Sequence, residues 1–179
     1  MEQVWTWDKE IFYFINSRLS SPFFDIFFWL FTSLGLGWVQ AILILSAGYW
    51  LRLKSIILNG ILSLILSGIL VHLFKQLLIQ RFRPSNLSDA IIAQGEVLYL
   101  GSFPSGHTAT SFAIATAVTL SWRGKKSNCA LILFGCATLV GISRVYRGLH
   151  WPTDVLAGAF LGFLAGCIAY WVIQAIRQK

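Results

Sequence analysis

Residues 143–154 read S-R-V-Y-R-G-L-H-W-P-T-D, and they interrupt a very apolar sequence with two arginines, a histidine and an aspartate. One apolar run precedes this stretch and another follows it almost to the end of the chain. Charged groups in or beside a lipid bilayer are costly, so a cluster of them usually marks a functional site. The alternative is a basic loop between two membrane helices, whose long side chains reach the lipid headgroups.

The spacing within this stretch indicates the chemistry of such a site. Pro152 suits the first turn of a helix, so a helix is predicted to begin there. Asp154 follows His150 by four residues, on the same side of that helix entry, where its carboxylate can hold the imidazole. A histidine oriented by a carboxylate and flanked by Arg144 and Arg147 indicates a nucleophile that acts on an anion.

The composition predicts an integral membrane protein with one domain over residues 1–179. Of the 179 residues, 56% are hydrophobic and 12% are charged, which leaves too few polar side chains to cover a soluble surface. The formal net charge of +7 would suit a nucleic-acid partner. The basic residues stand at the ends of apolar runs rather than on one face, so nucleic-acid binding is not expected. Nothing in the sequence indicates an oligomeric state.

Six apolar segments are predicted to form an all-α transmembrane bundle. Their ranges are 22–34, 38–52, 54–80, 105–122, 128–143 and 152–176. The first two are shorter than the ~20 residues of a full span, so either helical structure extends past the turn signals or one segment lies shallowly. Residues 1–20 mix aromatic and charged positions at helical spacing, which favours an interfacial helix or, equally, a helix packed on the bundle.

Six crossings would bring the polar segments together on one side of the membrane, including the polar loop at 85–103. That side carries five Lys or Arg, all inside the candidate site. The other side carries nine: Lys9, Arg18, Arg52, Lys54, Arg123, Lys125, Lys126, Arg177 and Lys179. Cytoplasmic loops are enriched in Lys and Arg, so the site is predicted to face the extracytoplasmic side, with both termini in the cytoplasm.

Residues 104–107 read P-S-G-H where a loop is predicted to become a helix. The first turn of a helix has free N–H groups and a partial positive charge, which suit an anion. Gly106 lets the backbone approach closely, Ser105 adds a hydroxyl donor, and His107 is placed to protonate a leaving oxygen. Pro and Ser are also ordinary at helix starts, so this short match is weak by itself.

Together these segments resemble the type-2 phosphatidic acid phosphatase superfamily, whose pattern is K-x6-R-P, then P-S-G-H, then S-R-x5-H-x3-D. The second part is intact at 104–107. The third part matches at every position: Ser143, Arg144, His150 and Asp154. Three motifs in the right order, covering residues 75–154 of an apolar chain, make a specific resemblance.

The first part of the pattern departs, because seven residues separate Lys75 from Arg83 where the family has six. On a continuous helix the extra residue turns one of the two side chains away by about 80°. A π-bulge could absorb it, or the helix could end before Arg81. Otherwise Gln76 occupies the helix position where the family has its lysine, and Lys75 or Arg81 approaches the phosphate site from the side.

The resemblance implies a membrane lipid phosphatase that needs no metal or other cofactor. His150 would attack phosphorus and form a phosphohistidine, Asp154 would orient its imidazole, and His107 would protonate the leaving group. The phosphoryl oxygens would be held by Arg144, Arg83, Lys75, Ser105 and Gly106, with Arg81 and Arg147 as further candidates. Fixed cations and donors of this kind can supply much of the catalysis of phosphoryl transfer.

An outward site on a short chain resembles the bacterial members of the family, which act in the inner membrane. Their substrates are undecaprenyl diphosphate, phosphatidylglycerophosphate, phosphatidic acid and the 1-phosphate of lipid A. Undecaprenyl diphosphate is favoured by analogy, because an outward site suits the recycling of a carrier lipid. The alternatives are a lipid-to-lipid phosphotransferase and a non-enzymatic transporter or scaffold, although no inverted repeat is visible in the sequence.

Overall fold

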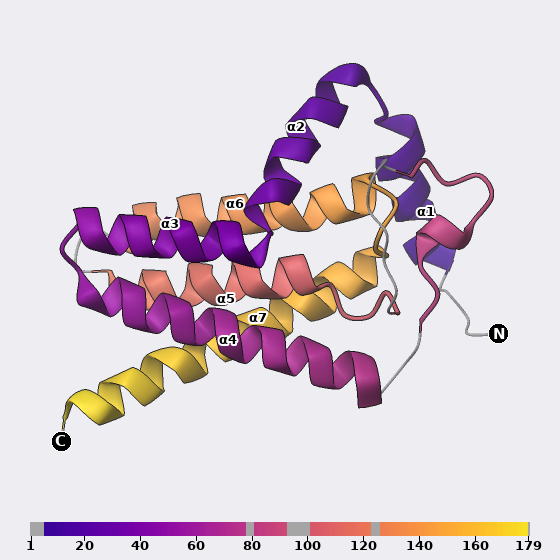
Figure 1. Cartoon of the computed structure of the whole chain (residues 1–179). Coiled ribbons are helices and arrows are strands. Elements are labelled where there is room, and N and C mark those ends of the chain that lie inside the picture. The colour runs from indigo at the N-terminus through magenta and orange to yellow at the C-terminus, as the bar shows by residue number, and fades with distance from the viewer. Residues whose placement is uncertain (1–5, 78–80, 93–100, 123–125, 179) are drawn as a thin grey trace.

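The structure is a computed structural model of the chain, and it describes residues 6–77, 81–92, 101–122 and 126–178. These residues form helices and no strand, which confirms the all-α prediction. In chain order the elements are α1 (Thr6–Tyr13), the π-helical turn η1 (Phe14–Arg18), α2 (Pro22–Leu34), α3 (Gly37–Trp50), α4 (Lys54–Leu77), the 3-10 turn η2 (Pro84–Asn86), α5 (Gly106–Ser121), α6 (Lys126–Tyr146) and α7 (Pro152–Arg177) (Figure 1).

The helix ends follow from local chemistry, and they agree with the six predicted segments to within three residues. Pro22 and Pro152 each occupy the first turn of a helix, where a missing N–H costs nothing. The hydroxyl of Ser21 also accepts the N–H of Phe24 at 3.3 Å, which caps α2. Of the loop at 85–103, the structure describes residues 85–92 and 101–103, and only the single turn η2 is helical there.

Five helices, α3 to α7, run back and forth as a bundle, while α2 leaves it at an angle (Figure 1). α5 is the central helix, since it packs against α4, α6 and α7. Its buried positions are small: Ala109, Ala113 and Ala117 have no exposed surface. Small side chains let helix backbones approach one another, which is the usual way in which helices pack inside a membrane.

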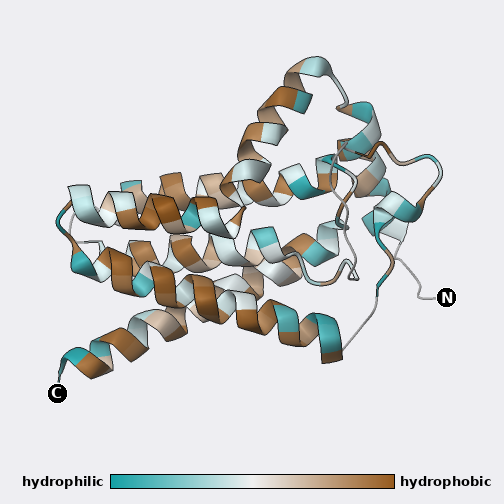
Figure 2. Ribbon diagram, viewed as in Figure 1, coloured by the Kyte–Doolittle hydropathy of each residue, from teal (hydrophilic) through white to brown (hydrophobic). Residues whose placement is uncertain are grey.

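Most residues of α4, α6 and α7 are hydrophobic, as Figure 2 shows. Large apolar side chains such as Trp50, Leu131 and Trp171 are at least two-thirds exposed. Among the described helices, α4, most of α6 and α7 are long and apolar enough to cross a bilayer. An apolar exterior on helices of this length identifies an integral membrane protein.

The predicted count of six spans is not confirmed, because α2 and α3 do not qualify as separate spans. Each has 13 or 14 residues and is therefore about 20 Å long, shorter than the hydrocarbon core. Together they are long and apolar enough to cross a bilayer as one broken span, which is bent by 69° between the two helices. The described helices thus give three spans, or four with this bent pair.

The position of α1 differs from the predicted arrangement, in which both chain ends lie opposite the site. α1 lies at the site end of the bundle, where Asp8 accepts a hydrogen bond from the backbone N–H of Thr153 at 3.0 Å. The last turn of α7 lies at the other end (Figure 1). The difference arises because the prediction counted α2 and α3 as two crossings. Residues 1–5 of the predicted interfacial helix lie outside the described residues.

Close packing of α7 on α5 fixes the geometry of the site. Gly158, Gly162 and Gly166 face the backbone of α5, at intervals of four residues. A Cβ atom at Gly158 would lie 2.5 Å from the carbonyl oxygen of Ser105, and one at Gly162 would overlap that of Ala109. Only glycine allows this approach, which sets the start of α5 against the start of α7.

Candidate active site

His150 and Asp154 meet at the entry to α7, as their spacing predicts. Asp154 Oδ2 accepts the backbone N–H of Trp151 at 2.9 Å, so the carboxylate caps its own helix. The same oxygen lies 3.6 Å from His150 Nδ1, close to hydrogen-bond distance but beyond it. His150 is 3% exposed and Asp154 has no exposed surface. Asp154 is therefore positioned to orient the imidazole.

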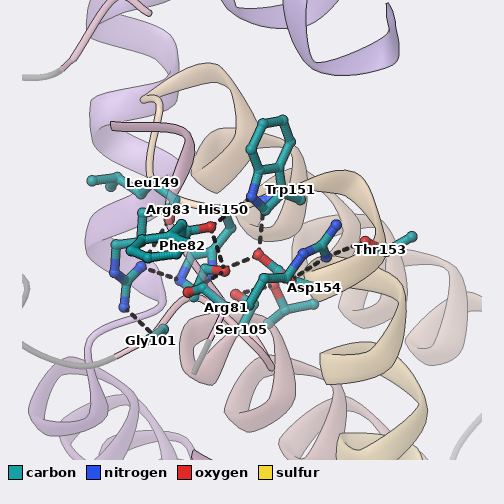
Figure 3. A network of polar contacts seen from close by, with 12 residues as sticks. Arg81, Phe82, Arg83, Gly101, Ser105, Leu149, His150, Trp151, Thr153 and Asp154 are labelled. Atoms are coloured by element: carbon teal, nitrogen blue, oxygen red, sulfur yellow. Dashed lines mark hydrogen bonds and ion pairs between the residues drawn. The ribbon is translucent and has the colours of Figure 1, made fainter. Parts of the chain in front are cut away.

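Arg83 faces the other nitrogen of the same imidazole. Its Nη1 donates to the carbonyl of Leu149 at 2.8 Å and lies 3.3 Å from His150 Nε2, as Figure 3 shows. Burial and, to a smaller extent, the charges of Arg144 and Arg83 lower the pKa of His150 to about 4, against the opposite effect of Asp154. His150 is therefore neutral over the whole physiological range, with a lone pair that can act as a nucleophile.

Lys75 points toward the same site although an extra residue separates it from Arg83. Its Nζ donates to the carbonyl of Gly101 at 2.6 Å, and Arg83 Nη2 donates to the same oxygen at 3.1 Å. α4 ends at Leu77 among the described residues, and Arg83 has extended backbone angles. The register argument for a continuous helix therefore does not apply, and the alternative in which the helix ends before Arg81 describes the structure.

The P-S-G-H turn packs against the segment that carries His150 and Asp154. The backbone N–H of Ser105 donates to the carbonyl of Asp154 at 3.0 Å, and the Ser105 hydroxyl accepts from Thr108 at 2.9 Å. α5 begins at Gly106, so the first N–H groups of the helix have no acceptor within it. His107 is half-buried and close enough to His150 and the site arginines to interact with them electrostatically.

Arg144 is buried at the end of α6 and braces the loop that carries His150. Its carbonyl accepts the N–H groups of Leu149 and His150 at 3.1 and 3.2 Å. Its Nη1 donates to the hydroxyl of Thr32 on α2 at 2.6 Å. Ser143, its neighbour in the motif, donates back to the carbonyl of Val140 in its own helix at 2.6 Å.

Arg81 and Arg147, the two further candidates, have contacts other than the one that Arg83 makes with His150 Nε2. Arg81 Nη1 binds the second oxygen of Asp154, Oδ1, at 2.7 Å (Figure 3). It therefore contacts the carboxylate that orients the histidine. Arg147 lines a separate cavity of about 410 Å³ together with Asp25 and Trp29.

Three residues of the site environment carried no readable signal in the sequence. Asp8 is fully buried and binds Arg81, 73 residues away. Thr32 binds Arg144 across 112 residues. Gly35 touches His107: a Cβ atom there would lie 2.6 Å from His107 Cδ2 and 2.9 Å from Val140 Cγ1. Contacts over such separations depend on how α1 and α2 fold back onto the bundle.

An apolar groove of about 430 Å³ lies between α3, α5 and α6. Leu34 and Val140 line its site end, next to the point where Gly35 touches His107. Leu51, Trp122 and Cys129 line its far end. The groove thus extends along the bundle, as an acyl chain would lie in a bilayer.

Comparisons with known proteins agree on one family. The family model described as "PAP2 superfamily" matches residues 56–178. The crystal structure of Aquifex aeolicus LpxE is similar, with a TM-score of 0.79 and 35% identity over 93% of this chain and 96% of that one. A transmembrane PAP2 type phosphatidylglycerolphosphate phosphatase from Bacillus subtilis has a TM-score of 0.77 and 27% identity over 96% of this chain and 86% of that one.

A curated relative also matches part of the chain. Lipid A 1-phosphatase of Porphyromonas gingivalis is 41% identical over 75 residues, which are 42% of this chain. The match covers only 17% of that relative's length.

Proposed function

Since the chain belongs to the PAP2 superfamily, we propose that it is a membrane lipid phosphate phosphatase that works through a phosphohistidine at His150. The observation that carries this proposal is the setting of the His150 ring. Nε2 lies 3.3 Å from Arg83 and Nδ1 lies 3.6 Å from Asp154. One nitrogen thus faces a cation that can hold a phosphate, and the other faces a carboxylate that can hold a proton.

The first step is attack of His150 Nε2 on phosphorus. In the resting enzyme Arg83 donates toward this nitrogen, so its lone pair is occupied. A bound phosphate takes over the N–H groups of Arg83 and frees the lone pair for attack. A P–N bond forms as the P–O bond to the lipid breaks, and Asp154 stabilises the positive charge that develops on the imidazole.

His107 takes up a proton when the phosphate anion binds beside it, and it gives this proton to the oxygen that leaves with the lipid. It lies in the first turn of α5, near the site end of the apolar groove. The lipid tail in the groove places the leaving oxygen next to this imidazole. His107 then takes a proton from a water molecule, whose oxygen attacks the phosphohistidine and releases inorganic phosphate and neutral His150.

The charge of the transferring phosphoryl group is met by fixed donors in the protein. Arg83, Lys75 and Arg144 bring three cations to the site, and the first turn of α5 adds free backbone N–H groups and the Ser105 hydroxyl. This arrangement supports a reaction that is independent of metal ions, because cations and dipoles already stand where negative charge spreads in the transition state.

The substrate is a phosphate monoester or diphosphate carried on a lipid. The outward site favours undecaprenyl diphosphate, and the names of two relatives add lipid A 1-phosphate and phosphatidylglycerolphosphate. The groove supports a substrate with a long hydrocarbon tail. Transfer of the phosphoryl group to a second lipid, in place of water, would use the same first step.

The charge distribution supports an inner-membrane protein whose site faces outward. Among the described residues, the end of the bundle away from the site carries four Lys or Arg and no Asp or Glu: Arg52, Lys54, Lys126 and Arg177. At the site end, Lys9 and Arg18 are the basic residues outside the candidate site. The far end is therefore cytoplasmic. α1 then lies on the extracytoplasmic surface, with Trp7, Ile11 and Phe14 exposed toward the headgroups.

The experiment that tests this function is phosphate release by purified protein in detergent with excess chelator, from each of the four candidate lipids. We expect release that survives chelation and falls on the order of 10³-fold or more in His150→Ala. The matched control is His72→Ala, because His72 is exposed on α4. Loss of activity on chelation would contradict the proposed metal-free reaction.

Further outcomes separate the other functions. If no lipid releases phosphate but a labelled donor passes its phosphate to an acceptor lipid, the protein is a phosphotransferase. If neither reaction occurs, the enzyme proposal is wrong and a transporter or scaffold becomes the leading function.

A further inference from the structure

Asp8 is a fully buried carboxylate that the proposed reaction does not use. It lies on α1, far in sequence from the three motifs, yet both of its oxygens are engaged at the active site. Oδ1 accepts the backbone N–H of Thr153 at 3.0 Å. Oδ2 accepts from the Thr153 hydroxyl at 2.7 Å and from Arg81 Nη2 at 2.5 Å. A buried carboxylate without such partners would be strongly destabilising.

Arg81 connects this carboxylate to Asp154. Its Nη2 binds Asp8, while its Nη1 binds Asp154 Oδ1 at 2.7 Å and the Thr153 hydroxyl at 2.5 Å. Its guanidinium also lies over the ring of Trp151, 5.6 Å from the ring centroid. A planar guanidinium suits this bridge because its two Nη groups can each serve a different carboxylate.

The chain conformation explains why two arginines close in sequence reach different groups. Residues 81–83 are not helical, and the side chains of Arg81 and Arg83 both point inward, whereas Phe82 is 69% exposed. Residues two apart share one side of an extended chain. Arg83 therefore reaches His150 Nε2, and Arg81 reaches Asp154 on the other side of the same imidazole.

We propose that Asp8 and Arg81 are positioning residues for the reaction, because they hold the Asp154 carboxylate in the orientation that directs Oδ2 to His150 Nδ1. The inference rests on the proposed function of His150 as nucleophile. Neither residue is placed to touch the phosphate, since both lie behind Asp154 as seen from Nε2. Docking of α1 is then a condition for a fully active site.

The physical basis is that separate hydrogen-bond donors hold the two oxygens of the Asp154 carboxylate. Its Oδ2 is held by the Trp151 N–H and its Oδ1 by Arg81, so the carboxylate has little freedom to rotate. Asp8 shares the positive charge of Arg81. Without Asp8, Arg81 pairs more completely with Asp154 and draws it from the histidine. Without Arg81, two buried carboxylates lose the cation between them, and Asp154 also loses a partner.

The first test is the kinetics of Asp8→Asn, which keeps the shape of the side chain and removes its charge. We expect kcat to fall about tenfold, the size typical for loss of a group that orients a functional histidine, with KM within about twofold of wild type. The matched control is Glu10→Gln, which removes the same charge from an exposed position on the same helix. A rise in KM at unchanged kcat, or equal behaviour of the two variants, would overturn the proposal.

A double-mutant cycle separates positioning from general destabilisation. If Asp8 acts through Asp154, then Asp8→Asn should lower kcat no further in a protein that already carries Asp154→Asn. If the fold-reductions in kcat of the two single variants multiply in the double variant, Asp8 acts independently of Asp154, and the proposal would fail. Unfolding midpoints of all variants, measured in the same detergent, verify that each protein compared is folded.

A spectroscopic readout keeps this proposal separate from the proposed function. The chain has three histidines, His72, His107 and His150, so ¹⁵N-histidine spectra can be assigned with single substitutions. Asp8→Asn should shift the His150 ring nitrogens and leave those of His72 unchanged, whether or not any lipid is hydrolysed. If phosphate is released and Asp8→Asn shifts nothing, the positioning proposal alone is wrong. If no lipid is hydrolysed and the shift appears, the proposed function alone is wrong.

Discussion

The two sides of α5 are built in opposite ways. Toward α7, glycines bring the helix backbones so close that a Cβ atom at Gly158 or Gly162 would meet a carbonyl oxygen of α5. Toward α3 and α6, the same helix borders an apolar groove of about 430 Å³. The closed side joins the P-S-G-H turn to His150 and Asp154, and the site end of the open side lies near His107. Catalytic groups need fixed positions, whereas a lipid tail needs room.

The largest effect should follow from breaking the closed side. Gly162→Val would place a branched side chain against the backbone of α5, so we expect a loss of about 3 kcal/mol of stability or more, and with it the loss of activity. Thermal unfolding in detergent, followed by circular dichroism, measures this. The control is Gly135→Val on α6, where a Cβ atom meets nothing within 4 Å. Equal midpoints for the two variants would show that the helices can separate at little cost.

A smaller and more selective effect should follow from filling the open side. Ala137 is buried on α6 and lines the groove, so Ala137→Phe would occupy space that a lipid tail uses. We expect kcat/KM to fall about tenfold for long-chain substrates and to change little for short-chain lipid phosphates, with the fold retained. Leu131→Phe, on the lipid-facing surface of the same helix, is the control. A uniform loss for all chain lengths would contradict a role of the groove in tail binding.

The smallest expected effect is a pH dependence of the protein's stability. It tests whether His150 is buried away from water on the closed side of α5. Burial lowers the pKa of His150 to about 4, whereas an unfolded histidine titrates near ~6.5. The unfolded state therefore binds the proton first, so the stability contributed by neutral His150 is present above pH ~6.5 and is lost as pH falls toward about 4. We expect the thermal unfolding midpoint of the wild-type protein to fall over this pH window. His150→Gln should show a smaller drop, and parallel curves would contradict the burial argument.

The sequence predicted the helices and the three motifs well, because both depend on local signals. Proline and serine mark the starts of α2 and α7, and the apolar runs define their lengths. The loop carrying His150 and the start of α5 were predicted to meet, and the Ser105–Asp154 hydrogen bond joins them.

Features that depend on tertiary geometry could not be predicted. The turn signals near residue 35 and the short length of the two flanking apolar runs were readable, but the 69° bend that joins them into one pair was not. The two runs were therefore counted as separate crossings, and α1 was expected at the end opposite the site. Arg81 was considered as a phosphate ligand because only its charge was visible. Its buried partner Asp8 lies 73 residues away, and no local pattern connects the two.

The position of α1 has a practical consequence for how the protein is handled. α1 covers the active-site end of the bundle through Asp8, while the last turn of α7 lies at the far end (Figure 1). An affinity tag or fluorescent reporter on the C-terminus therefore stays clear of the catalytic groups. The same fusion on the N-terminus adds bulk next to Arg81 and Thr153. In the proposed orientation, the two fusions would also report from opposite sides of the membrane.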